Sequence, residues 1–126
     1  MVNEYILGKF VQHFLREMNI WAVEDDQICK LVKISELELS VWRGVQHPAT
    51  DLRKIPVTDE TYNRFWDLMK IAEVLRTSLA FPRAWLKDGA PEVPFLGYAT
   101  PLDFLLAASK EDIEKLKNYL VYEQDA

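Results

Sequence analysis

The sequence predicts an all-α fold in which an N-terminal helix-turn-helix part packs with a small C-terminal helical part. Apolar residues recur at spacings of three and four along most of the 126 residues, whereas the alternation typical of strands is scarce. Residues 24–44 contain two short helical patterns that are joined by a turn and ended by a glycine. Residues 100–106 carry a strong signal for the start of another helix. These three observations favour helices throughout the chain.

The composition indicates a compact chain with a substantial core. Hydrophobic residues make up 49% of the sequence, which contains four Trp, five Tyr and six Phe. We divide the chain into residues 1–57 and 58–126, with one continuous compact unit as the alternative.

The net charge is −5, from 15 Lys and Arg against 20 Asp and Glu. The chain therefore lacks the overall positive potential that draws proteins to nucleic acids or anionic lipids.

The single cysteine, Cys29, excludes an internal disulfide and a multi-cysteine zinc site. It lies in an apolar-periodic segment between Ile28 and Leu31, so we expect a buried structural thiol. The first residues lack the basic start and apolar run of a signal peptide, and no stretch approaches the ~20 apolar residues of a membrane span. We therefore expect a cytoplasmic protein with no membrane partner.

Residues 4–18 predict an amphipathic helix. Its apolar stripe includes Phe10 and Phe14, and its polar side includes His13 and Arg16. We interpret this stripe as a surface that packs against the core or against a second copy of the chain, and we expect a homodimer.

The next stretch predicts a helix-turn-helix. Asp25 and Asp26 open its first helix, Ser35 is a suitable N-cap for the second, and Gly44 ends it. The second helix of such a motif usually contacts DNA bases. The candidate DNA-contacting residues are Lys30, Lys33, Ser35, Glu36, Glu38, Ser40, Arg43, Arg53 and Lys54. Because phosphates repel carboxylates, the alternative that this motif only packs, without binding DNA, stays open.

Residues 45–57 are interpreted as a loop, after which Thr58 caps a long helix. Apolar residues at helical spacing form one face of this helix: Phe65, Leu68, Met69, Ala72, Leu75 and Leu79. Pro82 is expected at the boundary or in the first turn of a short helix that extends through Trp85 and Leu86. A loop is expected over residues 88–98.

Residues 100–103 combine three signals for a helix start. Thr100 can accept a backbone N–H as N-cap, Pro101 fits the first helical position, and Asp103 at the third position is favourable to the helix dipole. The last helix is expected to begin at Ser109, with Asp112 at its third position.

The sequence gives little support to catalysis. Its two histidines, His13 and His47, show neither metal-ligand spacing nor the pattern of a catalytic triad with Cys29. The four glycines are scattered and form no phosphate-binding loop. We therefore expect no catalytic residue, no metal and no cofactor, and a protein that is not an enzyme.

Two motifs carry a family resemblance. Trp85-Leu86, and Gly97 followed by Thr100-Pro101-Leu102-Asp103, resemble the C-terminal toxin-binding domain of the Xre/MbcA/ParS antitoxins. The Trp42-Arg43-Gly44 end of the second short helix resembles the Xre-type helix-turn-helix. The resemblance covers about residues 24–120 and is strongest over 81–106. The sequence departs from the family pattern at two places. The segment after Leu106 lacks the glycines that are usual in the family, and residues 87–94 replace the asparagine-bearing loop of the family.

The resemblance implies a type II antitoxin with a cognate toxin, most often a RES-domain enzyme that degrades NAD. Such antitoxins cover the entrance of the toxin active site with their C-terminal part. The side chains expected at this contact are Trp85, Leu86, Phe95, Leu96, Tyr98, Pro101, Leu102 and Tyr122. Core filling is the alternative for the aromatic and leucine residues among them. Tyr122 is included because the acidic tail beside it could pair with basic residues that bind a phosphate-rich cofactor.

Two other functions remain open at this point. The chain could be a helix-turn-helix transcriptional regulator with operator DNA as its partner and no toxin. It could also be a small adaptor protein that has lost DNA binding, which the presence of Glu36 and Glu38 on the second short helix would fit.

Overall fold

The computed structural model describes residues 2–6, 8–44, 54–78, 82–88, 93, 96 and 100–125. This part of the chain forms an all-α fold with one small sheet, which confirms the predicted class. In chain order the elements are β1 (Val2–Ile6), α1 (Gly8–Ile20), α2 (Asp25–Val32), α3 (Glu36–Arg43), β2 (Lys54–Thr58), α4 (Asp59–Ser78), α5 (Pro82–Asp88), α6 (Pro101–Ala107) and α7 (Lys110–Asp125).

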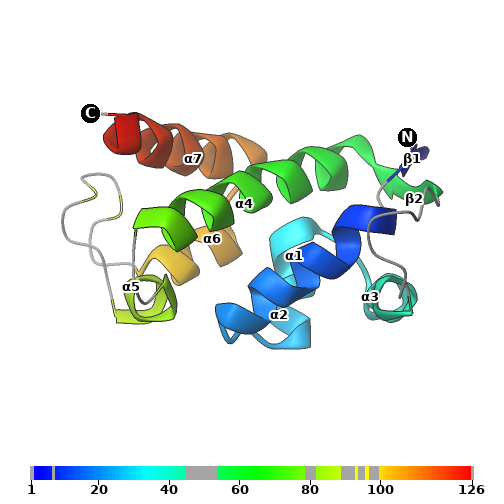
Figure 1. The fold of residues 1–126 in the computed structure, drawn as a ribbon. Coiled ribbons are helices and arrows are strands. Elements are labelled where there is room, and N and C mark those ends of the chain that lie inside the picture. The colour runs from blue at the N-terminus through cyan, green and yellow to red at the C-terminus, as the bar shows by residue number, and fades with distance from the viewer. Residues whose placement is uncertain are drawn as a thin grey trace.

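The long helix α4 lies at the centre of the molecule, between α7 on one side and α1, α2 and α6 on the other (Figure 1). Its buried residues recur at helical spacing, as predicted for the apolar face, and include Phe65, Leu68, Ala72 and Leu75. Ile71 is also fully buried. An apolar surface this wide lets α4 pack against helices on both of its sides.

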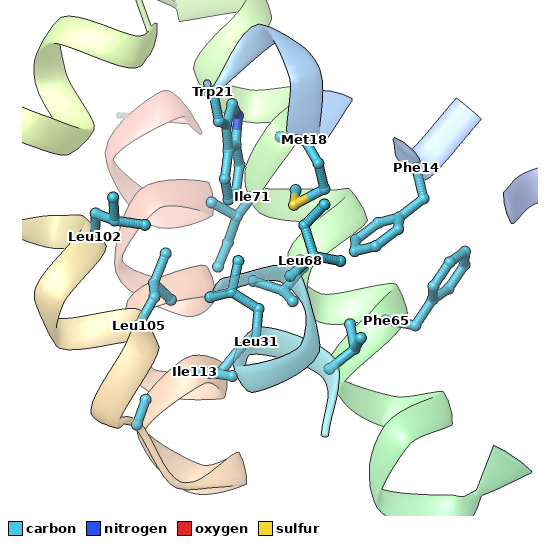
Figure 2. Close-up of a cluster of buried hydrophobic side chains, with 14 of the residues drawn as sticks. Phe14, Met18, Trp21, Leu31, Phe65, Leu68, Ile71, Leu102, Leu105 and Ile113 are labelled. Carbon is cyan, nitrogen blue, oxygen red and sulfur yellow. The ribbon is translucent and has the colours of Figure 1, made fainter. Parts of the chain in front are cut away.

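One hydrophobic cluster joins all of these helices. Figure 2 shows side chains of α1, α2, α4, α6 and α7 converging, among them Met18, Leu31, Leu68 and Ile113. Trp21, which follows α1, is fully buried in the same cluster. Buried residues on both sides of the predicted boundary at residues 57 and 58 therefore share one core.

The sheet corrects two predictions. Residues 4–6 were expected at the start of a helix but belong to strand β1, and α1 begins only at Gly8. Residues 54–57, expected in a loop, belong to β2, which pairs with β1 in an antiparallel register from Val2 opposite Thr58 to Ile6 opposite Lys54. Residues 45–53 lie outside the described residues.

The physical reason for the second strand is a short alternation in the sequence. Ile55 and Val57 are buried in the core, whereas Pro56 between them is exposed. Proline removes one backbone donor, which a two-stranded sheet tolerates because each strand has an unpaired edge. The presence of Pro56 had indicated a loop. The segment forms a strand nevertheless, because Ile55 and Val57 on either side of Pro56 pack into the core.

The predicted helix caps at Thr58, Thr100 and Ser109 are confirmed. Thr58 accepts a hydrogen bond from the Thr61 N–H at 3.1 Å, and Ser109 accepts one from the Asp112 N–H at 3.2 Å. At α6 the Thr100 hydroxyl accepts from the Asp103 N–H at 3.1 Å, and a proline occupies the first turn. Each of these caps satisfies a backbone donor that the helix itself leaves unpaired.

Replacing Thr100 by Ala should lower the free energy of unfolding by about 1 kcal/mol, because the Asp103 N–H loses its acceptor. Chemical denaturation followed by circular dichroism measures this change. Thr100→Ser is the control, since serine keeps the hydroxyl and should remain close to the wild type. Equal losses for both substitutions would contradict the role of the cap.

Candidate functional site

The helices α2 and α3 form the predicted helix-turn-helix. Glu24 and Gln27 form a capping box at the start of α2, in which the Glu24 N–H donates to Gln27 Oε1 at 2.8 Å. Lys33, at the end of α2, has a left-handed backbone conformation with φ 61°. This conformation ends α2 and redirects the chain toward Ser35, which starts α3.

A second capping box fixes the start of α3. The Ser35 hydroxyl accepts from the Glu38 N–H at 3.1 Å, and Glu38 Oε1 accepts from the Ser35 N–H at 3.0 Å. The buried side of α3 consists of Leu39 and Trp42. Trp42 packs edge-on against Phe14 and Phe65, with ring centroids 6.0 Å and 5.8 Å away. The rotation of α3 about its own axis is thereby set.

Polar side chains of α4 hold the turn between α2 and α3. Arg64 is fully buried, and its Nε donates to the carbonyl of Leu31 at 2.7 Å. The Thr61 hydroxyl donates to the carbonyl of Lys33 at 3.1 Å. Both acceptors lie at the C-terminal end of α2, where backbone carbonyls lack helical partners and a cation is favourable. Burial lowers the pKa of Arg64, which Glu60, 3.7 Å from Nη1, partly offsets.

The outward side of α3 combines apolar and acidic side chains. Leu37 is 77% exposed and Val41 57% exposed, one helical turn apart on the same face. Glu36 and Glu38 are exposed on either side of them. A hollow of about 320 Å³ lies beside this face, lined by Asp25, Glu36, Leu39, Ser40 and Arg43.

The acidic character of this region also acts on Cys29. The side chain of Cys29 packs against the core but is only partly buried, which corrects the expected buried thiol. Burial raises the pKa of the thiol, and nearby carboxylates raise it further, in the order Glu36, Asp25, Asp26 and Glu38. The carboxylates that act on Cys29 thus come from both α2 and α3.

The structure brings most of the predicted DNA-contacting residues together, and two of them already have partners within the chain. Lys33, Ser35, Glu36, Ser40 and Arg43 are all exposed on the helix-turn-helix. The Ser35 hydroxyl is used by the cap, and the Arg43 guanidinium forms an ion pair with Asp25. Lys30 and Glu38 are exposed as well. Lys54 lies in β2, and Arg53 lies outside the described residues. DNA binding by this set stays a prediction.

The predicted toxin-contacting residues fall into two groups. Leu86, Leu96, Pro101 and Leu102 are buried within the chain's own core. Trp85 is half-buried, and Tyr122 is 72% exposed near the end of α7. Phe95 and Tyr98 lie outside the described residues. Toxin binding stays a prediction, and in this conformation Tyr122 presents the most accessible side chain of the described group.

Sequence reasoning missed the two exposed apolar side chains of α3. Leu37 and Val41 were absent from the expected contact residues, although their spacing of four places them together on the polar side of a short helix. An isolated apolar pair on a surface flanked by glutamates is the signal that would have found them.

A second hollow of about 560 Å³ lies between α1 and α4, lined by Phe10, His13, Trp66, Met69, Lys70, Glu73 and Arg76. Arg76 pairs with the buried carboxylate of Glu17, and Lys70 lies 3.5 Å from Glu73. Since these cations are matched by carboxylates, the hollow presents little net charge to a ligand.

In the described ranges, no three His, Cys, Asp or Glu side chains are grouped so that they could hold a metal ion. Within the same ranges, no helix is both long and apolar enough to span a bilayer. No family model, curated protein or solved structure matches this chain in the three comparisons made.

Replacing Thr61 by Val should lower the free energy of unfolding by about 1–3 kcal/mol, because the Lys33 carbonyl loses a donor inside the protein. Denaturant titration measures the change. Thr77→Val is the control for the loss of a hydroxyl away from the turn, since Thr77 is exposed and its hydroxyl donates to the Glu73 and Val74 carbonyls of α4 itself. It should stay within about 0.5 kcal/mol of the wild type. Similar losses for both variants would contradict a specific role of Thr61 at the turn.

Alkylation of Cys29 by iodoacetamide should show a higher midpoint pH in the folded protein than in the chain unfolded by denaturant, because burial and the surrounding carboxylates disfavour the thiolate. The higher pKa of Cys29 in the folded protein also affects stability. Its contribution is fully present below the pKa that the thiol has in the unfolded chain, and it is lost as the pH rises through the pKa that the thiol has in the folded protein.

The paired substitution Glu36→Gln, Glu38→Gln should move that alkylation midpoint toward lower pH. Glutamine removes the charge at both positions and can still complete the Ser35 capping box. The matched control is Glu111→Gln, Glu114→Gln on α7, which changes the net charge equally and should leave the midpoint unchanged. A midpoint that does not respond to the first pair would argue against an acidic field at Cys29.

Proposed function

We propose that this protein is the antitoxin of a type II toxin–antitoxin system. It binds a cognate toxin of the RES-like, NAD-degrading type and covers the entrance of the toxin active site. It acts in the cytoplasm as a homodimer, as a binding protein and not as an enzyme, and it requires no cofactor.

The observation that carries this proposal is the arrangement of the two helices that bear the family resemblance. α5, which contains Trp85 and Leu86, contacts α6, which begins with the Thr100 cap and Pro101 (Figure 1). Two segments separated by residues 89–100 in the sequence are thus adjacent in space. Leu86 and Leu102 anchor the pair in the core, and Trp85 is left half-buried at its surface.

Tyr122, on α7, supports the same function. Its side chain is 72% exposed on α7, and tyrosine is among the residues that most often anchor protein interfaces. It is followed in the sequence by Glu123 and Asp125. A toxin that binds the phosphates of NAD needs basic residues near its active site, and an acidic segment is complementary to them.

The alternative function is a transcriptional regulator that binds operator DNA. The helix-turn-helix geometry and the exposed Lys33 favour it. The exposed carboxylates of Glu36 and Glu38 on the helix that would enter the major groove oppose it, because each faces phosphate repulsion. A gel shift on the promoter of the gene at several salt concentrations separates the two functions, since phosphate contacts give a steep salt dependence.

Coexpression with the product of the adjacent gene should yield a stable complex and restore growth that this product alone inhibits. In that complex, Tyr122→Ala should weaken binding about tenfold while changing the free energy of unfolding by less than about 0.5 kcal/mol, because the ring is exposed. Calorimetry and denaturant titration measure the two quantities.

Asn118→Ala is the control for that experiment, since Asn118 is also exposed on α7. It should change neither affinity nor stability. If no complex forms and growth is not restored, the antitoxin function is wrong. If the complex forms and Tyr122→Ala binds as tightly as the control, the contact lies elsewhere on the protein.

A further inference from the structure

We propose that the outward face of α3 is a docking surface for a basic amphipathic helix of a partner protein. The face consists of Leu37 and Val41 with Glu36, Ser40 and Glu38 around them. It is separate from the C-terminal contact proposed above and does not depend on the toxin function. Three features support it: the rotation of α3, the exposure of its two apolar side chains, and the charge around them.

The geometry of the helix places the apolar pair at the centre of the exposed side. Successive residues of an α-helix are about 100° apart. Leu39 and Trp42 point into the core, so Leu37 and Val41 point away from it, with Glu36 and Glu38 on opposite flanks. An apolar stripe between two acidic flanks is the complement of a helix that carries an apolar stripe between lysines or arginines.

The hollow beside this face fits a long basic side chain. It has a volume of about 320 Å³ and is rimmed by Asp25 and Glu36, with the buried Leu39 in its lining. Lysine and arginine carry an aliphatic stem and a charged end, so the stem can lie against Leu39 while the cation reaches the carboxylate of Glu36. The Asp25 carboxylate is already paired with Arg43, which also lines the hollow.

Charge also decides between the possible occupants. DNA would bring phosphates against Glu36 and Glu38, and Arg43 is already paired with Asp25. A second copy of the chain would bring the same carboxylates against themselves if it docked with this face. A basic helix is attracted by these carboxylates and can at the same time bury Leu37 and Val41.

The test uses a fluorescein-labelled model peptide of about 18 residues, long enough for five helical turns, in which leucines form one face and lysines the remainder. Fluorescence anisotropy measures its affinity for the full-length protein. A peptide of the same composition with the helical pattern scrambled should bind at least about tenfold more weakly, because it cannot present an apolar stripe. Amide chemical shifts should change at α3 when the patterned peptide is added.

Two variants locate the binding surface. Leu37→Ala, Val41→Ala should weaken peptide binding about tenfold or more, while helix-favouring alanines preserve the fold. Glu36→Gln, Glu38→Gln should also weaken it about tenfold and reduce its salt dependence, since two attractive charges are lost. The control Glu111→Gln, Glu114→Gln changes the net charge equally and should bind as the wild type does.

Three results would overturn the proposal. The first is equal affinity for the patterned and scrambled peptides, or an equal loss of peptide affinity in the α3 variants and in the α7 control. The second is displacement of the peptide by a short random-sequence DNA duplex with a steep salt dependence. The third is a change of oligomeric state: light scattering finds a dimer for the wild type and a monomer for the double variant Leu37→Ala, Val41→Ala. A second copy of the chain would then occupy the face.

Discussion

The position of the helix-turn-helix depends on two polar side chains that α4 directs at the end of α2. Arg64 and Thr61 donate to the carbonyls of Leu31 and Lys33, respectively. Burying a guanidinium is costly. The negative end of a helix and the hydrogen bond from Nε offset part of this cost, while Nη1 and Nη2 have no hydrogen-bond partner among the described residues. These bonds tie the turn to the longest helix, so that α3 is attached to the central scaffold and not only to its neighbour α2.

This attachment determines what α3 presents to its surroundings. With the turn fixed and Trp42 packed against Phe14 and Phe65, α3 cannot rotate without losing core contacts. Leu37 and Val41 therefore stay exposed in the free protein, at the expense of hydrophobic burial. The same fixed rotation keeps Glu36 and Glu38 beside them, so the combination of apolar and acidic groups is a property of the packing.

Local features of the fold were predictable, and long-range features were not. The caps at Thr58 and Thr100 follow from residues three positions apart, which is within the reach of sequence patterns. The strand β2 depends on pairing with a segment about fifty residues earlier, and the proline within it indicated a loop. At the candidate site, spacing identifies an apolar residue without showing what covers it. Leu102 is covered by the core and Leu37 by nothing in the described part of the chain.

The two proposed surfaces lie at opposite ends of the molecule. Figure 1 shows α3 near the strands, whereas α5 and the C-terminal end of α7, which contains Tyr122, lie toward the other end of α4, on opposite sides of that helix. Because they share no side chain and are separated by the length of α4, contributions from the two surfaces to binding should be independent. A partner held at Tyr122 leaves α3 accessible, so the surfaces can engage two proteins at once, or two parts of one large partner.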